Sequence, residues 1–237
     1  MKRLAVSLAP VVVLALGAGP TTGVRAAPIN RVRAGVARNW AGYVAFGGPY
    51  TSASTTWSEP SVRCAAQENS SAAIFAGIDG AGSTTVEQIG TFANCRNGRV
   101  THHPFYEMYP TPASPISKPV RAGDSLTANV VASAPQTFTL TLVDHTANWT
   151  FSTQQRSTSA QLASAEAIVE APTLRGSGIQ PLANFRRVQF GGTTANGQPI
   201  GSLGAQAFTM ETSSGVVRAA PSSLAGGTSF SVVWRHA

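Results

Sequence analysis

The feature that most limits the fold of this chain is a series of short runs rich in Val, Ile, Thr, Phe and Tyr. Clusters of Gly, Pro, Asn and Ser separate the runs, and long helical periods are nearly absent. Such runs between turn residues are typical of β-strands, and many of them at close spacing predict a β-sandwich. The expected strands are Trp40–Phe46, Ser52–Trp57, Ala72–Ile78, Thr84–Gly90, His103–Tyr109, Ser125–Ala132, Thr137–Val143, Trp149–Thr153, Glu166–Glu170, Phe185–Phe190, Ala207–Glu211 and Thr228–Trp234.

One segment does not fit this pattern clearly. Ala160–Ala171 is rich in Ala, Leu and Glu, which suit a helix as well as a strand. Local propensity leaves both structures open there.

The N-terminus has the pattern of a secretory signal peptide. Lys2 and Arg3 precede an apolar run, Leu4–Gly19, and the small residue Ala26 offers a cleavage point before Ala27. We therefore predict a signal peptide at 1–26 and an extracellular mature protein; an uncleaved membrane anchor is the alternative. Residues 27–38 are basic and lack an apolar pattern, so they are a flexible arm or a short propeptide, and 39–237 form one β domain.

Much of the positive charge belongs to the predicted signal peptide. Removing residues 1–26 takes away three basic and no acidic residues, which lowers the formal charge from +7 to +4. The remaining basic residues are scattered, so we expect no nucleic-acid partner. No later segment is apolar enough to span a membrane, so we expect no stable membrane association once the signal peptide is removed. We also expect a monomer.

The two cysteines, Cys64 and Cys95, are predicted to form a disulfide, because an oxidising compartment favours a bridge over two free thiols. Closing a loop of about 30 residues contributes about 3 kcal/mol, mostly by restricting the unfolded chain. Two cysteines and no zinc-binding helix motif make a metal site unexpected, and no cofactor motif is present. His102 and His103 point to opposite faces of a strand and are expected at the surface.

Only ten carboxylates occur in the chain, so each one inside an apolar strand has to be solvent-facing, hydrogen-bonded or functional. Alternation puts Phe105, Glu107 and Tyr109 on one face, which is either an exposed strand surface or the wall of a groove. The same rule aligns Glu166 and Glu170 about 13 Å apart. That spacing is too long for a glycosidase pair, although a pair across strands, Glu107 with Glu170, remains open.

Six segments in one order are similar to the glutamic peptidases, the eqolisin family. They are Asn39-Trp40-Ala41-Gly42-Tyr43, Gly77-Ile78-Asp79-Gly80, Val86-Glu87-Gln88-Ile89-Gly90, Tyr106-Glu107-Met108-Tyr109-Pro110, Ala165-Glu166-Ala167-Ile168-Val169-Glu170-Ala171-Pro172 and Pro181-Leu182-Ala183-Asn184-Phe185. The match runs from about residue 39 to 190.

The resemblance implies a secreted endopeptidase that acts on polypeptides at acidic pH. It implies two large antiparallel sheets of the concanavalin A-like or jelly-roll type, with a concave active-site face, and a strand ending at Glu170. The family's catalytic glutamine and glutamate fall on Gln88 and Glu170. The substrate-binding positions that it implies are Asn39, Trp40, Phe75, Asp79, Gly80, Phe105, Glu107 and Tyr109.

A carboxyl and an amide suit peptide hydrolysis, because Glu170 can transfer protons while Gln88 orients a water and donates to the developing oxyanion. Phe75, Phe105 and Ala167 depart from the family pattern. The resemblance therefore does not predict the shape of the substrate pockets or the side chains that they prefer. A lectin-like carbohydrate-binding sandwich and a glycoside hydrolase are the alternatives. Gln88 discriminates between them, because a glycosidase needs a second carboxylate at a comparable position.

Overall fold

The computed structural model describes residues 24–237, so residues 1–23 of the predicted signal peptide lie outside the described residues. Nearly all regular structure in the described part is β. The elements are β1 (Val24–Arg25), β2 (Arg31–Arg33), β3 (Val36–Ala37), β4 (Trp40–Phe46), β5 (Ser52–Ser58), β6 (Asn69–Asp79), β7 (Val86–Arg96), β8 (Arg99–Tyr109), β9 (Ser114–Pro115), β10 (Ser125–Ala134), β11 (Thr137–Asp144), β12 (Trp149–Arg156), β13 (Ser164–Glu170), β14 (Thr173–Leu174), β15 (Gly178–Ile179), β16 (Arg187–Ala195), β17 (Gln198–Pro199), the 3-10 helix η1 (Ile200–Leu203), β18 (Gln206–Glu211), β19 (Val217–Pro221) and β20 (Phe230–Trp234). The all-β prediction is confirmed, and each of the twelve expected strands overlaps an observed one.

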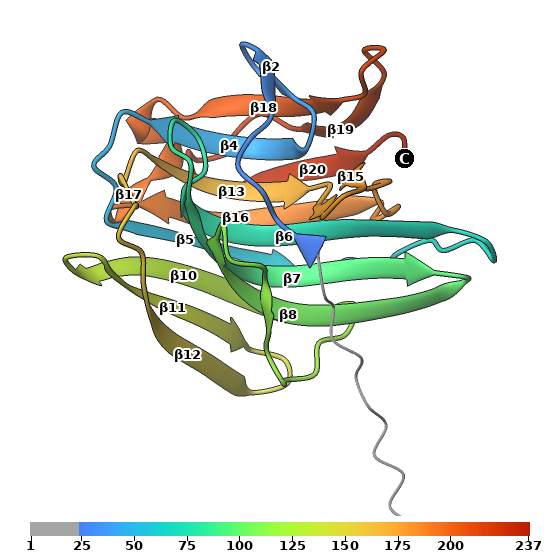
Figure 1. Cartoon of the computed structure of the whole chain (residues 1–237), viewed down its shortest axis with the longest axis horizontal. Helices are drawn as coiled ribbons and strands as arrows, with labels where there is room; N and C mark the ends of the chain where they lie inside the picture. The colour runs from blue at the N-terminus through green and yellow to red at the C-terminus, as the bar shows by residue number, and fades with distance from the viewer. Residues whose placement is uncertain (1–23) are drawn as a thin grey trace, which may run out of the picture.

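The strands form two layers (Figure 1). One layer has the order β9–β8–β7–β6–β13–β4–β18, and the other has the order β12–β11–β10–β5–β16–β20–β19–β18, so that β18 joins them. Pairing within both layers is antiparallel, whereas β3 runs parallel to β18. A separate small sheet has the order β1–β14–β15.

The ambiguous segment forms a strand from Ser164 to Glu170. This strand pairs with β4 on one side and with β6 on the other. Hydrogen bonding along both edges outweighs the local preference of its Ala and Glu residues for a helix.

The main apolar core lies between the layers and follows the period of two along each strand. Examples are Leu126, Ala128 and Val130 on β10; Phe138, Leu140 and Leu142 on β11; and Ala165, Ala167 and Val169 on β13. Burying each large aliphatic side chain contributes about 1.5–3 kcal/mol. Because these β13 residues face the core, Glu166, Ile168 and Glu170 point to the opposite side. We call that side of β4, β13, β6, β7 and β8 the site face.

The predicted Cys64–Cys95 disulfide is present, with the two Cα atoms 5.3 Å apart. It ties the loop before β6 to the end of β7. The surface prediction was wrong for His102, because its ring nitrogen Nδ1 lies 2.7 Å from the buried carboxylate of Glu59. Within residues 24–237 no helix is long and apolar enough to cross a membrane.

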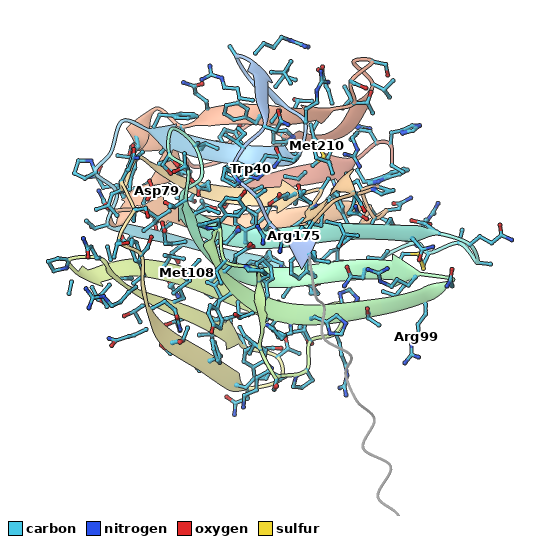
Figure 2. The ribbon with its side chains drawn as sticks, in the orientation of Figure 1. Trp40, Asp79, Arg99, Met108, Arg175 and Met210 are labelled. Carbon is cyan, nitrogen blue, oxygen red and sulfur yellow. A yellow bond between two sulfur atoms is a disulfide. The ribbon has the colours of Figure 1, made fainter. Side chains whose placement is uncertain are left out.

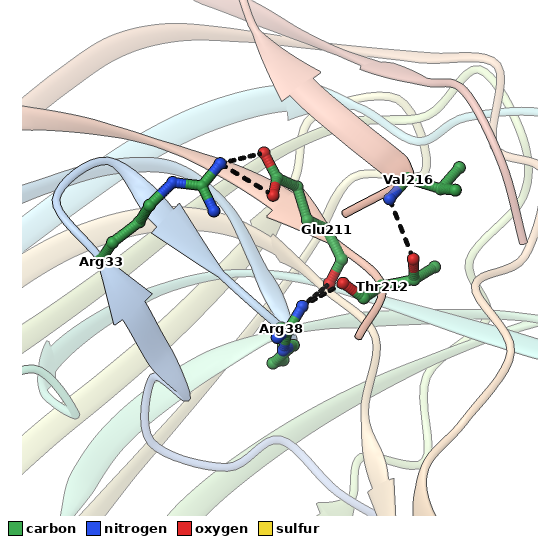
Figure 3. Close-up of polar contacts among 5 residues, drawn as sticks. All are labelled: Arg33, Arg38, Glu211, Thr212 and Val216. Carbon is green, nitrogen blue, oxygen red and sulfur yellow. Dashed lines mark hydrogen bonds and ion pairs between the residues drawn. The ribbon is translucent and has the colours of Figure 1, made fainter. Parts of the chain in front are cut away.

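The basic segment that precedes β4 is attached to β18 (Figure 3). The Arg33 guanidinium lies 3.0 Å from both carboxylate oxygens of Glu211. The Arg38 guanidinium donates to the carbonyl of Thr212. Val36 and Ala37 also pair with β18, so residues 31–38 are held by main-chain and side-chain contacts together.

Candidate active site

Gln88 and Glu107 lie side by side on the site face. They are direct partners in the register of β7 and β8, so their side chains leave the sheet on the same side. The Gln88 amide nitrogen Nε2 donates to Glu107 Oε2 over 3.2 Å. Both side chains are fully buried.

Glu170 is the last residue of β13 and lies opposite Trp40 of β4. Its Oε1 accepts a 3.3 Å hydrogen bond from the side-chain amide of Asn39. Asn39 directly precedes β4, so the end of one strand and the start of its neighbour together position the carboxyl group. Glu170 is also fully buried.

The chain's own N-terminal segment lies against these side chains. Gln88 Nε2 donates to the carbonyl oxygen of Ala26 over 2.8 Å, and the amide of Ala27 donates to Glu170 Oε1 over 2.8 Å. Gln88 and Glu170 therefore bind opposite ends of one peptide bond. The amide of Ala26 donates to Glu107 Oε2 over 2.9 Å.

Asn39 and Trp40 bind the next part of the same segment. The indole nitrogen of Trp40 donates to the carbonyl oxygen of Ala27 over 3.0 Å. The Asn39 amide donates to the carbonyl of Pro28 over 3.1 Å, and its oxygen accepts from the amide of Asn30 over 2.7 Å. Both residues thus contact a polypeptide main chain.

The aromatic residues predicted for the site line this face. Phe75 packs edge-on against Trp40, with ring centroids 5.8 Å apart. Phe105 stacks on Phe92 at 4.1 Å. Tyr109 is at the end of β8, opposite Val86.

Asp79, Gly80 and Ala167 have different surroundings. The carbonyl of Gly80 accepts from the amide of Ile29, which belongs to the N-terminal segment. The Asp79 carboxylate accepts instead from the amides of residues 161, 162 and 163, so it fixes the loop before β13. Figure 2 shows Asp79 near the end of the strands and Trp40 farther along the sheet. Ala167 packs in the core between the layers, so its departure from the family pattern does not border the site.

Burial controls the electrostatics of the site. Burial raises the pKa of Glu170 well above its usual value; the Ala27 amide opposes this rise, and the nearby Glu107 adds to it. Burial likewise raises the pKa of Glu107, while the Ala26 amide and the charge of Arg25 oppose the rise. These carboxyl groups therefore hold their protons to a higher pH than exposed glutamates do.

Several buried acceptor atoms at the site have no hydrogen-bond partner among residues 24–237. They are Gln88 Oε1, Glu107 Oε1, Glu166 Oε1 and Glu170 Oε2. An acceptor on Gln88 and another on Glu170 are thus available to a water or a substrate group. In the described part, no group of three or more His, Cys, Asp or Glu side chains could hold a metal ion.

Sequence reasoning missed two parts of this site. Glu166 lies on the site face beside Gly77. A Cβ atom added at Gly77 would lie only 2.8 Å from Glu166 Oε1 and 3.4 Å from Gln88 Cβ, so Gly77 leaves the space that these two side chains occupy. Alternation along β13 already aligned Glu166 with Glu170, which was a usable signal. Nothing in the sequence indicated that Ala26 and Ala27 would lie between Gln88 and Glu170.

Comparison with known proteins gives consistent matches. The family model described as the Peptidase A4 family matches residues 38–234, which extends well beyond the six motifs recognised in the sequence. No curated protein sequence matches significantly.

Solved structures with the same fold include three peptidases. Scytalido-glutamic peptidase, solved with a transition state analog inhibitor, is 23% identical with a TM-score of 0.72, over 84% of this chain and 98% of that chain. SCP-B, solved with the tripeptide Ala-Ile-His, is 22% identical with a TM-score of 0.68, over the same shares. Aspergilloglutamic peptidase from Aspergillus niger is 25% identical with a TM-score of 0.61, over 70% of this chain and 99% of that chain.

Proposed function

The chain belongs to the Peptidase A4 family of peptide hydrolases, and we propose that Gln88 and Glu170 are its catalytic pair. The observation that carries the proposal is that both side chains form hydrogen bonds with the same peptide bond. Gln88 Nε2 lies 2.8 Å from the carbonyl oxygen of Ala26, and Glu170 Oε1 lies 2.8 Å from the nitrogen of Ala27. Those are the atoms that gain negative charge and a proton, respectively, when a peptide bond is hydrolysed.

Each side chain has one part in the reaction. A water attacks the carbonyl carbon while the Gln88 amide donates to the oxygen that becomes the oxyanion. Glu170, as the carboxylate, takes a proton from the water and then delivers it to the nitrogen as the C–N bond breaks. The acceptor atoms Gln88 Oε1 and Glu170 Oε2 are available to orient the water. A raised pKa makes the ionised Glu170 a stronger base than an exposed glutamate, and it also means that a smaller fraction of Glu170 is ionised in the acid range.

Glu107 supports this pair without transferring a proton. Its Oε2 accepts from the Gln88 amide and from the amide of Ala26. The first contact points the Gln88 NH₂ group toward the substrate carbonyl, and the second holds the substrate main chain. Glu107 is therefore a positioning residue.

Polypeptides are the substrates of this site. The contacts of Asn39 and Trp40 with main-chain carbonyls support recognition of an extended chain, and solved relatives carry a peptide or a transition state analog inhibitor. Saccharide binding and glycoside hydrolysis are not favoured by the family match. Secretion is part of the proposal, and the signal pattern and the disulfide support it.

The test is an acid-range assay on an unfolded protein substrate. We expect the wild type to cleave it and Glu170→Gln to have no measurable turnover. Glu68→Gln is the matched control, because it makes the same chemical change at a partly exposed glutamate before β6. Full activity of Glu170→Gln, with folding of all three proteins verified by circular dichroism, would overturn the assignment.

A further inference from the structure

We propose that Glu166 is a positioning residue that acts through Gln88. In its neutral form it leaves the Gln88 amide turned toward the substrate, and in its ionised form it draws that amide away, which lowers kcat at higher pH. This role rests on the proposed catalytic pair and goes beyond it, because it adds a third carboxyl group to the site and assigns to it the upper pH limit of activity.

Glu166 and Glu107 flank Gln88 in one row of residues across the site face. Glu166 of β13 is the register partner of Gly77 on β6, and Gly77 is the partner of Gln88 on β7. Gln88 is in turn the partner of Glu107 on β8. Because Gly77 has no side chain, those of Glu166 and Gln88 approach each other above it. Gln88 therefore lies between two carboxyl groups.

The hydroxyl group of Ser164 indicates which form of Glu166 the fold accommodates. Three groups surround its Oγ: the Ala81 amide nitrogen at 3.2 Å, the Asp79 carbonyl oxygen at 2.7 Å and Glu166 Oε2 at 2.9 Å. The amide donates to Oγ, and the carbonyl oxygen can only accept, so the single hydroxyl proton goes to Asp79. The third contact is then a hydrogen bond only if Glu166 Oε2 carries a proton and donates it. A carboxylate would leave two acceptors facing each other.

Glu107, on the other side of Gln88, has the opposite surroundings. Its Oε2 accepts from the Gln88 side-chain amide over 3.2 Å and from the Ala26 amide over 2.9 Å. Glu166 Oε1 is buried and has no hydrogen-bond partner within residues 24–237. Different surroundings assign different protonation states to neighbouring carboxyl groups. Here Glu107 is the acceptor and Glu166 is the neutral acid.

The charges that act on Glu166 favour its neutral form. Asp79 at the end of β6 and Glu87 on β7 are both acidic, and Glu170 lies on the same face at the end of β13. Burial raises the pKa of Glu166 well above its usual value; Ser164 opposes the rise, and Asp79 and Glu87 add to it. Glu166 therefore keeps its proton in the acid range and loses it as the pH rises through its pKa in the folded protein.

The other elements around Glu166 supply no compensating cation within the described part of the chain. Its register partner on β4 is uncharged. The arginines of β7 and β8, Arg96 and Arg99, are partners at the far ends of those strands. The charge of Arg25 acts on Glu107, which is the other carboxyl group of the row. An ionised Glu166 consequently depends on the nearest polar side chains for hydrogen bonds.

Ionisation of Glu166 would therefore compete with the substrate for the Gln88 amide. Gln88 Nε2 donates to the Ala26 carbonyl and to Glu107, so both of its protons are in use. A carboxylate on the opposite side of Gln88 attracts the same NH₂ group, and a turn of the amide toward it removes the donor from the oxyanion. Because that donor stabilises the transition state, kcat should fall as Glu166 loses its proton.

The experiment compares the pH–rate profiles of the wild type and Glu166→Gln on an unfolded protein substrate. Glutamine cannot ionise, and its NH₂ group can donate to Ser164 as the protonated acid does. We expect kcat of the variant at the acid optimum to stay within about threefold of the wild type. At the higher pH where the wild type has lost about tenfold in kcat, the variant should have lost no more than about threefold.

Glu87→Gln is the matched control. Glu87 is also fully buried, burial raises its pKa, and it neighbours Gln88 in the chain, but its side chain lies on the other side of the sheet. This substitution should leave the fall of kcat at higher pH in place. Tryptophan fluorescence at each pH verifies that the proteins stay folded over the range assayed. A fall that Glu87→Gln displaces as far as Glu166→Gln does would report on the stability of the fold and overturn the role of Glu166.

A second comparison tests whether Glu166 acts through Gln88. In Gln88→Ala protein, adding Glu166→Gln should no longer displace the fall of kcat, because the amide that Glu166 attracts is absent. An equal displacement with and without Gln88 would overturn the inference, as would a wild-type profile in Glu166→Gln; both results leave Gln88 and Glu170 as the catalytic pair. Complete loss of kcat in Glu166→Gln at every pH would make Glu166 a proton-transfer group instead. No activity in the folded wild type would refute the proposed function itself.

Discussion

Glu87 should make this fold less stable as the pH rises from the acid range. It neighbours Gln88 on β7 but is opposite Met108 and Ile78, on the side away from the site face. Its side chain is fully buried, and neither carboxyl oxygen has a hydrogen-bond partner within the described residues. Burial raises the pKa of Glu87 from 4.5 to about 8; nearby Ser157 and Thr85 oppose the rise, and the nearby Asp79 adds to it. A carboxylate in this position is therefore costly.

The sign and size follow from proton linkage. The unfolded chain releases this proton near pH 4.5, whereas the folded protein keeps it until the pH approaches 8. The stabilisation is complete below the unfolded pKa and is lost as the pH rises through the folded pKa. A rise from pKa 4.5 to about 8 corresponds to a difference of about 5 kcal/mol in the free energy of unfolding.

The perturbation is Glu87→Gln, made in Glu170→Gln protein so that the unfolded chain is not digested. Glutamine resembles the protonated acid and cannot ionise. The free energy of unfolding is measured at pH 4.5 and pH 8 by urea titration with tryptophan fluorescence. We expect its fall between these pH values to be smaller in the double variant than in Glu170→Gln alone, by on the order of 4 kcal/mol. Glu68→Gln in the same background is the control for a partly exposed glutamate. Equal pH dependence of the unfolding free energy with and without Glu87 would show that Glu87 is not its source.

Two further predictions concern Gln88 and the disulfide. Gln88→Ala should lower kcat by about 10²–10³-fold, because an oxyanion donor is lost. Gln88→Glu should be severely impaired at any pH where the introduced carboxyl group and that of Glu170 are both ionised. Full activity of Gln88→Glu at such a pH, in a pH–rate profile, would indicate a carboxylate pair instead. Replacing Cys64 and Cys95 together with Ser should lower the free energy of unfolding by about 3 kcal/mol, and two free thiols in a titration of the unfolded wild type would contradict the bridge.

Alternation and turn residues were sufficient to predict most of the longer strands, but they missed β19 and the short strands β1, β2, β3, β9, β14, β15 and β17. They placed Glu107 on the same face as Phe105, as the structure has it. They did not decide between helix and strand for β13, because its pairing with β4 and β6 involves partners more than 80 residues away along the chain. The composition of a segment does not show which distant strands it pairs with, so this pairing could not be predicted from residues 160–171 alone.

The site was less predictable than the fold. Asp79 lies in a motif that predicts a substrate contact, but its carboxylate accepts hydrogen bonds from the amides of residues 161–163. His102 has the context of a surface residue, but Glu59 binds it in a buried position. Each case depends on a loop or strand that the chain brings in from a distance. The N-terminal segment with Ala26 and Ala27 is the extreme case, because its contacts with Gln88 and Glu170 span 62 and 143 positions of the chain.

The role of Glu170 in proton transfer is tested most directly by comparing kcat for Glu170→Gln and Glu107→Gln on an unfolded substrate in the acid range. Both glutamates are fully buried, both accept a main-chain hydrogen bond from the N-terminal segment, and burial raises the pKa of both, so the two substitutions are chemically matched. We expect no turnover for Glu170→Gln, because the group that transfers protons is gone. We expect reduced but measurable turnover for Glu107→Gln, since only the positioning of Gln88 and the substrate is weakened. Activity retained by Glu170→Gln and abolished in Glu107→Gln would contradict the role assigned to Glu170.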